Sequence, residues 1–397
     1  MLAILTTHPI QYQVPIWKEL ARRGQVPFEV WYLSDQGARH GLDAEFGREF
    51  SWDVDLLGGY PHRFLSTQPP RADLKTFRGA RIGSLEHLFR DKKALWINGW
   101  QVQAYWQAAF QASRLGVPVW LRGESNDLAP RPRARTVARW IALRLLFHHI
   151  SRFLYIGHAN WREYVRFGVR PEQLVPAPYC VDNSRFRASA EAARGERETL
   201  RAQWNIPATA ICLLYAGKLI AKKRLFDLFD AFSIALERHP ALAGSMHLLL
   251  AGDGELMPPL QSKAAHLAAR YGKPVASFAG FLNQTQMPQA YAVADCLVLP
   301  SDSRETWGLV VNEALASGIP AIVSDLCGCA EDLIGPLDPQ FVFPCGRVDI
   351  LADVIEAVST GRLPLPCAGR CRGVVSRHDL SLTVDTVTQE YARLASV

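Results

Sequence analysis

The order of apolar and polar segments between residues 295 and 324 constrains the fold of this chain more than any other feature. The stretch contains an apolar run, a polar turn, an amphipathic segment and a second apolar run, at residues 295–299, 300–305, 307–316 and 321–324. Apolar runs of this length are typical of buried strands, and the amphipathic segment predicts a helix that ends before Gly318. Strand, helix and strand in this order predict a parallel sheet, with the polar turn at the edge where ligands bind.

Two carboxylates and a glycine make this turn and helix a candidate binding site. Glu305 lies in the turn, and Glu313 lies eight positions later in the predicted helix. Gly308 is at the helix start, where free backbone N–H groups and the helix dipole can hold an anion. This layout suits a ligand with hydroxyl groups on both sides of a phosphate, such as a nucleotide sugar. The alternatives are that Glu305 caps the helix and that Glu313 lies on a solvated helix face.

The same stretch resembles the donor-site signature of retaining glycosyltransferases with the GT-B fold, in particular glycosyltransferase family 4. The elements of that signature are matched by Glu305, Gly308-Leu309-Val310, Glu313-Ala314 and Gly318-Ile319-Pro320. The resemblance implies that Glu305 binds hydroxyls of the donor sugar and that Glu313 binds the ribose hydroxyls of the nucleotide. It also places four residues between them against the donor: Thr306, Trp307, Gly308 and Leu309.

Basic residues follow the predicted strand at residues 211–217. Lys218 and Lys223 lie at the strand end and just before a predicted helix, where a diphosphate would find fixed positive charge. A solvated basic turn is the alternative. The resemblance assigns diphosphate binding to both lysines, although Lys218 replaces the usual arginine and Arg224 replaces a usual glycine. It completes the donor site with residues in three predicted turns: Gly217, Gly252, Gly280, Phe281 and Leu282.

The beginning of the chain predicts a second domain of the same class. An apolar strand, a loop, a helix and a strand are expected at residues 3–7, 8–12, 14–23 and 28–33. His8 lies in the loop, at a ligand-binding edge; the alternative is a histidine that bonds the backbone. The loop resembles a subset of the family that begins with His-Pro-Ile-Gln-Tyr. Glu124 follows another predicted strand, where many members have a histidine, and is expected to position an acceptor hydroxyl or to cap a helix.

Basic residues are distributed unevenly along a chain of net charge +6. They are concentrated in the N-terminal half, and residues 128–162 contain arginines and apolar residues without a single acidic one. A basic, apolar helix can lie on an anionic membrane, so residues 131–152 are expected to make a peripheral membrane contact. The alternative is a packed helix with solvated arginines. No nucleic-acid recognition motif accompanies these residues, and nucleic acid is not an expected partner.

Composition argues against membrane-spanning, secreted and metal-binding classes of protein. No apolar run reaches the roughly 18 residues of a membrane-spanning helix, and the first residues lack the basic start of a secretion signal. The eight cysteines include no C-x2-C pair and no matching histidine cluster, so no metal site and no cofactor are expected. Cysteines without a disulfide pattern favour a reducing, cytoplasmic compartment. The expected membrane contact would then be at the inner face of the membrane.

The chain is therefore expected to form a GT-B fold, with two doubly wound α/β domains facing a cleft. Residues 1–185 are expected to bind the acceptor, residues 186–375 the nucleotide sugar, and residues 376–397 to form a helix that returns to the first domain. Residues 184–201 are expected to contain the interdomain linker and a first helix.

The resemblance implies retaining, metal-independent transfer of a sugar from a nucleotide-diphosphate sugar to a hydroxyl of a glycan, lipid-linked or small-molecule acceptor, in polysaccharide or glycolipid synthesis. The residues expected to act in catalysis are Lys218, Lys223, Glu305, His8 and Glu124. Two alternatives remain open. One is a nucleotide-sugar epimerase of the same fold, and the other is a non-catalytic subunit that binds nucleotide or glycan.

Overall fold

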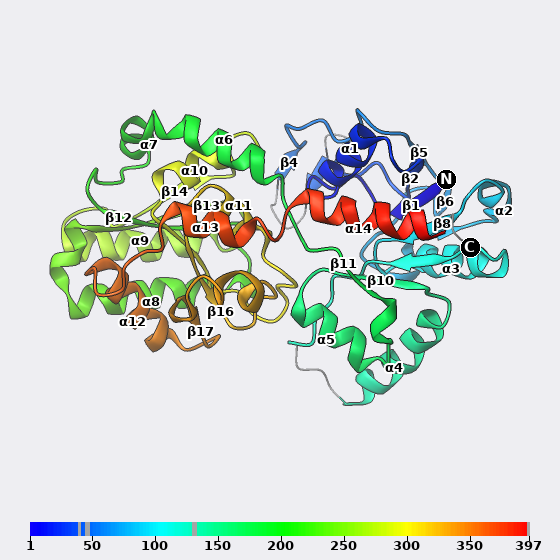
Figure 1. The fold of residues 1–397 in the computed structure, drawn as a ribbon. Coiled ribbons are helices and arrows are strands. Elements are labelled where there is room, and N and C mark those ends of the chain that lie inside the picture. The colour runs from blue at the N-terminus through cyan, green and yellow to red at the C-terminus, as the bar shows by residue number, and fades with distance from the viewer. Residues whose placement is uncertain (39–40, 44–47, 129–132, 395–397) are drawn as a thin grey trace. The chain divides into compact units, whose positions relative to one another are not determined.

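Two sheets of parallel strands organise the chain, one in each of two units. A computed structural model describes residues 1–397 except 39–40, 44–47, 129–132 and 395–397 (Figure 1). Contacts divide it into unit 1, which comprises Met1–Gly41, Val54–Tyr179 and Asp379–Val397, and unit 2, which comprises Leu42–Asp53 and Cys180–His378. A short segment of the N-terminal half thus belongs to unit 2, and the end of the chain belongs to unit 1.

The described part of unit 1 contains a seven-stranded sheet in the order β11-β10-β9-β8-β1-β2-β5. All six neighbouring pairs are parallel. The strands are β1 (Leu2–Thr6), β2 (Phe28–Tyr32), β5 (His62–Phe64), β8 (Ala94–Ile97), β9 (Val119–Leu121), β10 (Arg152–Tyr155) and β11 (Leu174–Pro176). A short pair, β6 (Thr67–Gln68) with β7 (Arg81–Ile82), lies outside this sheet, and a second pair, β3 (Gly41–Asp43) with β4 (Arg48–Phe50), lies almost wholly in the segment that belongs to unit 2.

Helices cover both faces of this sheet. On one face, Trp17 of α1 (Val14–Arg23) meets Trp96 of β8 edge to face, with ring centroids 5.0 Å apart, and α14 (Leu380–Arg393) packs on α1. The other face carries one apolar core shared with α2 (Glu86–Phe89), α3 (Gln103–Arg114), α4 (Arg133–Phe147) and α5 (His158–Arg166). Because successive strand residues point to opposite faces, strands with both faces buried are apolar throughout, as β1 is.

Unit 2 has the same architecture, with the strand order β14-β13-β12-β15-β16-β17 in its described residues and parallel pairing throughout. The strands are β12 (Ile211–Ala216), β13 (Met246–Ala251), β14 (Ala276–Gly280), β15 (Cys296–Leu299), β16 (Ala321–Ser324) and β17 (Val342–Phe343). The predicted α/β class with two doubly wound sheets is confirmed.

The helices of unit 2 form two groups whose members pack on one another. One group contains α8 (Leu225–Arg238), α9 (Met257–Tyr271) and α12 (Val348–Ser359). The other contains α6 (Asn183–Arg194), α7 (Arg197–Gln203), α10 (Met287–Val293), α11 (Leu309–Ala316) and α13 (Ala368–Val375). No helix of the described residues is long and apolar enough to cross a membrane.

Of the interdomain linker and first helix predicted at residues 184–201, the helix is confirmed and the linker is wrong. The segment forms α6 and α7, which pack on α10 within unit 2. The Asp182 side chain accepts a hydrogen bond from the backbone N–H of Arg185 and so begins α6. Phe186 and Leu200 are buried. The polar sequence hid this packing because each short helix buries only a narrow apolar stripe.

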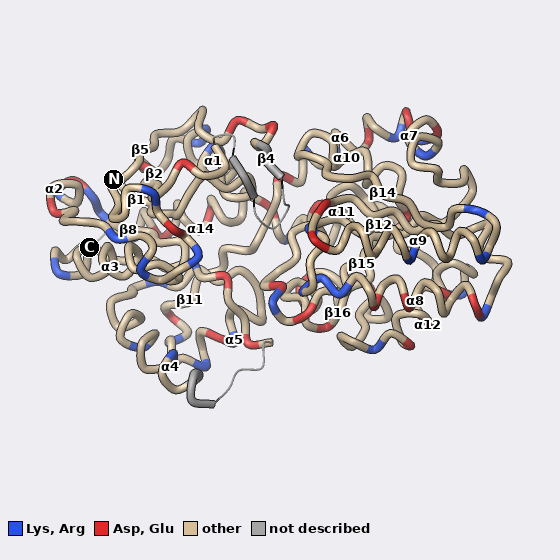
Figure 2. Tube along the Cα trace, turned by 180° about the vertical axis from the view of Figure 1, so that it is seen from behind, with Lys and Arg blue, Asp and Glu red and all other residues tan. Residues whose placement is uncertain are grey.

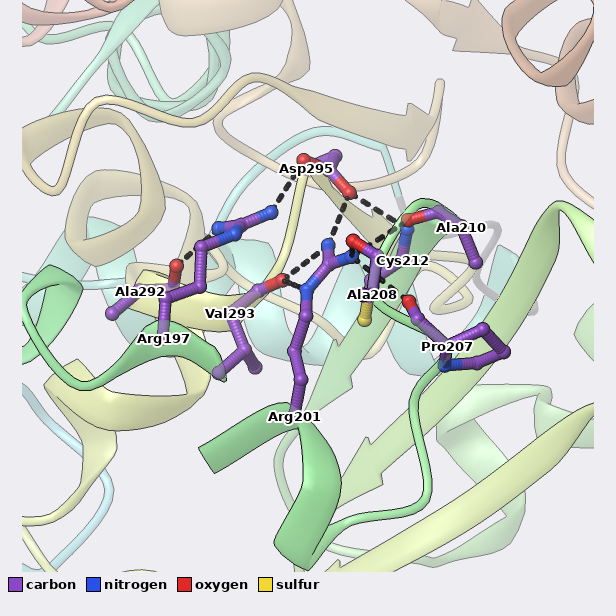
Figure 3. A network of polar contacts seen from close by, with 9 residues as sticks. All are labelled: Arg197, Arg201, Pro207, Ala208, Ala210, Cys212, Ala292, Val293 and Asp295. Carbon is purple, nitrogen blue, oxygen red and sulfur yellow. Dashed lines mark hydrogen bonds and ion pairs between the residues drawn. The ribbon is translucent and has the colours of Figure 1, made fainter. Parts of the chain in front are cut away.

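Arg201 joins α7 to the sheet of unit 2 through a network of polar contacts (Figure 3). Its guanidinium is 4% exposed and donates to the carbonyl oxygens of Val293, Pro207, Ala208 and Ala210. It also forms an ion pair with Asp295, at 2.8 Å between Nη2 and Oδ2. The same carboxylate accepts from the backbone N–H of Cys212 and pairs with Arg197. Every nitrogen of the buried Arg201 guanidinium therefore has a partner.

Replacing Arg201 by methionine, which keeps the aliphatic volume, should destabilise unit 2 by about 3–5 kcal/mol, because several carbonyl groups lose their buried donor and the partly buried Asp295 carboxylate loses one of its partners. Arg197→Met is the matched control. It removes a more exposed arginine from the same carboxylate and should cost about 1 kcal/mol or less. Urea unfolding measures both, and equal losses would contradict the central role of Arg201.

Candidate functional site

Three glycines stand at the carboxyl edge of the unit 2 sheet, where β12, β13 and β14 end. Gly217, Gly252 and Gly280 have φ angles of 139°, 150° and 72°, in the region that favours glycine. Their backbones approach one another closely: Gly217 N–H donates to Ala251 O at 2.9 Å, and Gly252 N–H donates to Gly280 O at 2.8 Å. The absence of side chains leaves backbone groups accessible at an edge where parallel sheets bind ligands.

Lys223 and Glu305, predicted from separate motifs, form an ion pair at this edge. Lys223 ends a short turn of 3-10 helix (Ala221–Lys223), and Glu305 lies in the turn between β15 and α11. Both side chains are largely buried, with 11% and 14% exposed. Glu305 also accepts a hydrogen bond from Ser301 Oγ at 3.2 Å. Glu305 therefore bonds to side chains across the turn, and Gly308 at the start of α11 has no side-chain cap.

The loop between β12 and α8 holds the second predicted cation, Lys218. The Tyr215 hydroxyl donates to the backbone oxygen of Lys218 at 2.8 Å and so fixes the start of the loop. Burial, followed by the charge of Glu305, raises the pKa of Tyr215 well above its ordinary value, which keeps this hydroxyl a donor. Arg224 ends the loop at φ 50°, a left-handed conformation that glycine adopts more readily.

The turn before α11 is shaped by Gly308 and Trp307. Gly308 has φ 101°, and a Cβ there would lie 2.8 Å from the Leu299 side chain. Trp307 is buried and donates from Nε1 to Asn312 Oδ1 at 2.8 Å. With Thr306 before it and Leu309 opening the helix, the turn directs the N-terminal N–H groups of α11 to the sheet edge.

Glu313 is 1% exposed, so its alternative as a solvated helix residue is wrong. It lies on α11 and accepts a hydrogen bond from the Tyr291 hydroxyl of α10 at 2.6 Å. A carboxylate is kept in such a place only with hydrogen-bond partners. Sequence reasoning missed Tyr291 and Ser301 as partners of the two glutamates, because Tyr291 comes from another helix and neither residue belongs to a motif.

Phe281 and Leu282 follow β14, and a segment distant in sequence meets them. Trp52 lies with its ring centroid 6.5 Å from that of Phe281. Asn283 Nδ2 donates to Ser51 O at 2.9 Å, and Thr285 N–H donates to the Asp53 carboxylate. All of these residues belong to unit 2. Trp52 thus joins the turn predicted to complete the donor site, a contact that no local pattern signals.

His8 and Glu124 lie in unit 1, whereas the other predicted site residues lie in unit 2. His8 follows β1, and its Nδ1 is 3.0 Å from Thr7 Oγ1. Burial lowers the pKa of His8 to about 4, so the imidazole is neutral at pH 7. Glu124 follows β9 and accepts a hydrogen bond from the Tyr179 hydroxyl at 2.7 Å. Glu124 therefore faces the end of the sheet. Among the described residues, no three His, Cys, Asp or Glu side chains gather as a metal site would need.

Comparison with known proteins connects this geometry to a family. Residues 196–366 match the family model described as glycosyl transferases group 1. A GDP-mannose-dependent alpha-mannosyltransferase of Mycobacterium tuberculosis is 33% identical over 172 residues, which are 43% of this chain and 38% of the relative. A GDP-mannose-dependent phosphatidylinositol dimannoside mannosyltransferase of the same species is 28% identical over 52% of this chain and 49% of the relative. The chain thus spans about half or less of the length of these curated relatives.

Solved structures resemble the whole chain. Anabaena HepE, solved in complex with UDP and glucose, is 17% identical, with a TM-score of 0.68 over 100% of this chain and 99% of the other. A UDP-forming trehalose-phosphate synthase of Burkholderia xenovorans is 13% identical, with a TM-score of 0.73 over 100% and 99%. At these identities the likeness shows the fold alone, which is the predicted GT-B fold.

The close approach of the glycines gives a direct test of this sheet edge. A Cβ at Gly252 would lie 1.8 Å from Gly217 O, so Gly252→Ala must move backbone and should cost about 3 kcal/mol in urea unfolding. Gly272→Ala is the control. Gly272 also has a positive φ, but no atom lies within 4 Å of the added carbon, so the substitution should lower the free energy of unfolding by about 1 kcal/mol. A Gly252 variant as stable as the control would contradict the packing described.

Proposed function

We propose that this protein is a glycosyltransferase that moves a sugar from a nucleotide-diphosphate sugar to an acceptor hydroxyl. The observation that carries the proposal is the buried Lys223–Glu305 pair beside the glycine-lined sheet edge. A buried lysine and carboxylate at a ligand-binding edge are poised to exchange partners. When a diphosphate binds, it takes Glu305's place beside Lys223, and Glu305 becomes free to accept hydrogen bonds from sugar hydroxyls.

The proposed mechanism uses fixed positive charge to stabilise the leaving group. Negative charge grows on the diphosphate as its bond to the anomeric carbon breaks. This charge is stabilised by Lys218, Lys223 and the N-terminal N–H groups of α11. The acceptor oxygen forms its bond to the same carbon on the same face, so configuration is retained. The departing phosphate oxygen takes the acceptor proton, and the proposal includes no metal ion.

The roles of the remaining predicted residues follow their places in the fold. Glu313, held by Tyr291, is proposed to bind the ribose hydroxyls, and the turn from Gly280 to Leu282 the base. In unit 1, neutral His8 and Glu124 are proposed to bind donor or acceptor hydroxyls. The names of the relatives support a glycan or glycolipid acceptor, since they include a phosphatidylinositol dimannoside mannosyltransferase and a lipopolysaccharide N-acetylglucosaminetransferase.

The donor is identified by thermal shift with uridine, guanosine, adenosine and thymidine diphosphates and their sugars, in buffer containing EDTA. A ligand at 100 times its dissociation constant should stabilise the protein by about 2.7 kcal/mol. Lys223→Ala should remove this shift, whereas Lys222→Ala, a neighbouring lysine with no described ion pair to Glu305, should keep it.

Each outcome of this experiment decides a different point. A shift with one base and none with the others names the nucleotide, and its survival in EDTA supports transfer without a metal. Loss of the shift in both lysine variants would contradict the assignment of Lys223. No shift with any nucleotide would favour the non-catalytic alternative, and turnover of the donor sugar without an acceptor into its epimer would favour the epimerase.

We also propose that unit 1 contacts an anionic membrane through α4, whose described arginines, Arg139 and Arg144, belong to the residues drawn in blue in Figure 2. Leu143, Leu146 and Phe147 are buried, so the packed-helix alternative holds for one face of α4. The other face exposes four apolar side chains, with 59%, 40%, 52% and 63% of their surface exposed: Val137, Trp140, Ile141 and Leu145. The side chains of residues 131–136 lie outside the described residues.

Basic groups adjoin this apolar stripe. The Arg144 guanidinium lies 4.9 Å from the ring centroid of Trp140. Arg144 also lines a groove with His148 and Arg170, and none of the described residues lining that groove is acidic. Exposed apolar side chains next to the positive charge of Arg144 suit the boundary between anionic headgroups and acyl chains.

Vesicle flotation tests this contact. The protein should float with phosphatidylglycerol vesicles and not with phosphatidylcholine vesicles. The double variant Ile141→Glu, Leu145→Glu should weaken binding at least about tenfold, because two exposed anchors become charges that anionic lipid repels. Leu115→Glu, which changes another exposed leucine of unit 1, is the control and should float like the parent. Equal flotation of all three proteins would refute the contact.

A further inference from the structure

Two neighbouring side chains in unit 1 hold buried polar atoms without partners. Arg122 is 1% exposed, and its Nε and Nη2 atoms make no hydrogen bond to any described residue. Asn98 is 9% exposed, and both its Oδ1 and its Nδ2 lack partners among the same residues. Buried polar groups are almost always hydrogen-bonded, so four such atoms in two adjacent side chains require an explanation.

Arg122 differs in this respect from the other deeply buried arginine described above. Arg201 donates from all three nitrogens to carbonyl groups and to the Asp295 carboxylate. Arg122 has the Tyr179 ring, 4.8 Å from its guanidinium carbon, and no ion pair with a described carboxylate. A buried, unpaired charge is costly, which indicates that its partner comes from outside the chain.

The two side chains lie together at the carboxyl edge of the unit 1 sheet. Leu5 pairs with Ile97, and Ile97 pairs with Leu121. The next residues on these strands, Asn98 and Arg122, therefore lie side by side and point to the same face. It is the face covered by α1, since Trp96, two residues before Asn98, packs on Trp17.

The N-terminus of α1 adds a third source of positive potential. Thr6 Oγ1, next to Asn98 in the sheet, donates to Gln13 Oε1 at 3.0 Å, and Gln13 is the residue before α1. The first turn of α1 has no acidic residue and no side-chain cap. The N–H groups of this turn are already bonded, since Val14 donates to Ile10 O and Ile16 to Gln13 O, but the positive end of the helix dipole meets the same edge as Arg122 and Asn98.

The partnerless atoms of Arg122 indicate the chemistry of the ligand. Nε and Nη2 form the side of the guanidinium that binds two oxygens of one carboxylate or phosphate group. The Asn98 amide can donate to a further oxygen. The opposite face of Arg122 is covered by Tyr179, whose hydroxyl is held by Glu124, so the guanidinium plane is fixed.

We propose that this edge of unit 1 binds an anionic group, a carboxylate or a phosphate, carried by the sugar acceptor. The inference rests on the proposed glycosyltransferase function and specifies the class of acceptor. A neutral sugar would leave the buried charge of Arg122 unpaired, whereas a uronic acid or a sugar phosphate neutralises it. Arg122 is then a specificity-determining residue, and Asn98 supports the same oxygens.

Binding of inorganic phosphate and of glucuronate tests the site, with glucose as the neutral comparison. The titrations use the Lys223→Ala protein, so that phosphate at the proposed donor site does not obscure the result. Arg122→Met should weaken the binding of both anions about a hundredfold. Arg122→Lys keeps the charge but loses the pair of N–H groups that binds two oxygens, and it should weaken binding by less. Arg78→Met, at an exposed arginine of unit 1, should change nothing.

The melting temperature without ligand provides an independent readout. If Arg122 is unpaired until an anion binds, Arg122→Met should melt no lower than its parent, in contrast to Arg201→Met. In the protein with Lys223 intact, Arg122→Met should keep the shift caused by nucleotide, which separates failure of this site from failure of the donor site.

Turnover then distinguishes the two sources of the anion. With the donor identified by thermal shift, glucose 6-phosphate, glucuronate and glucose are compared as acceptors. If the anion is a phosphate, glucose 6-phosphate should exceed glucose in kcat/KM by about a hundredfold; if it is a carboxylate, glucuronate should do so. Arg122→Met should remove that difference. Unchanged anion binding in Arg122→Met, or a melting temperature several degrees below the parent without ligand, would overturn the proposal.

Discussion

Parallel pairing of strands is the constraint on which the rest of this structure depends. It brings the carboxyl ends of all strands in a unit to one edge, where loops and helix N-termini gather. In unit 2 this edge holds Gly217, Gly252, Lys223 and the turn to α11. In unit 1 the corresponding edge holds Asn98, Arg122 and the start of α1. Residues far apart in the sequence become neighbours because their strands end together.

Three buried cations illustrate how the same chemistry serves different purposes. Arg201 is bonded to backbone carbonyls and to Asp295, and it fixes α7 on the sheet. Lys223 is paired with Glu305 at a ligand-binding edge, where an anionic ligand can replace the carboxylate. Arg122 has an aromatic ring and no described carboxylate. The number of fixed partners thus separates a structural cation from one that is available to a ligand.

Much of the fold and of the unit 2 site could be predicted because both depend on patterns among residues that are close in the sequence. Apolar runs identified β12, β15 and β16, and Gly308 marked the beginning of α11. Prediction was weaker where local composition and packing disagree. The polar segment that forms α6 and α7 resembled a linker, since its burial depends on α10, more than 80 residues away. The sequence also allowed Glu313 to lie on a solvated helix face, whereas in the structure it is buried and accepts a hydrogen bond from Tyr291.

The sequence by itself determined the class of fold, the order of strands and helices, and the residue types at the donor edge, because periodicity and glycine positions are properties of neighbouring residues. The tertiary structure decided which of those residues meet. It paired Lys223 with Glu305, set Trp52 against Phe281, and left Arg122 buried without a carboxylate. The physical reason is that burial and charge pairing depend on contacts between distant segments, which only the folded sheet creates.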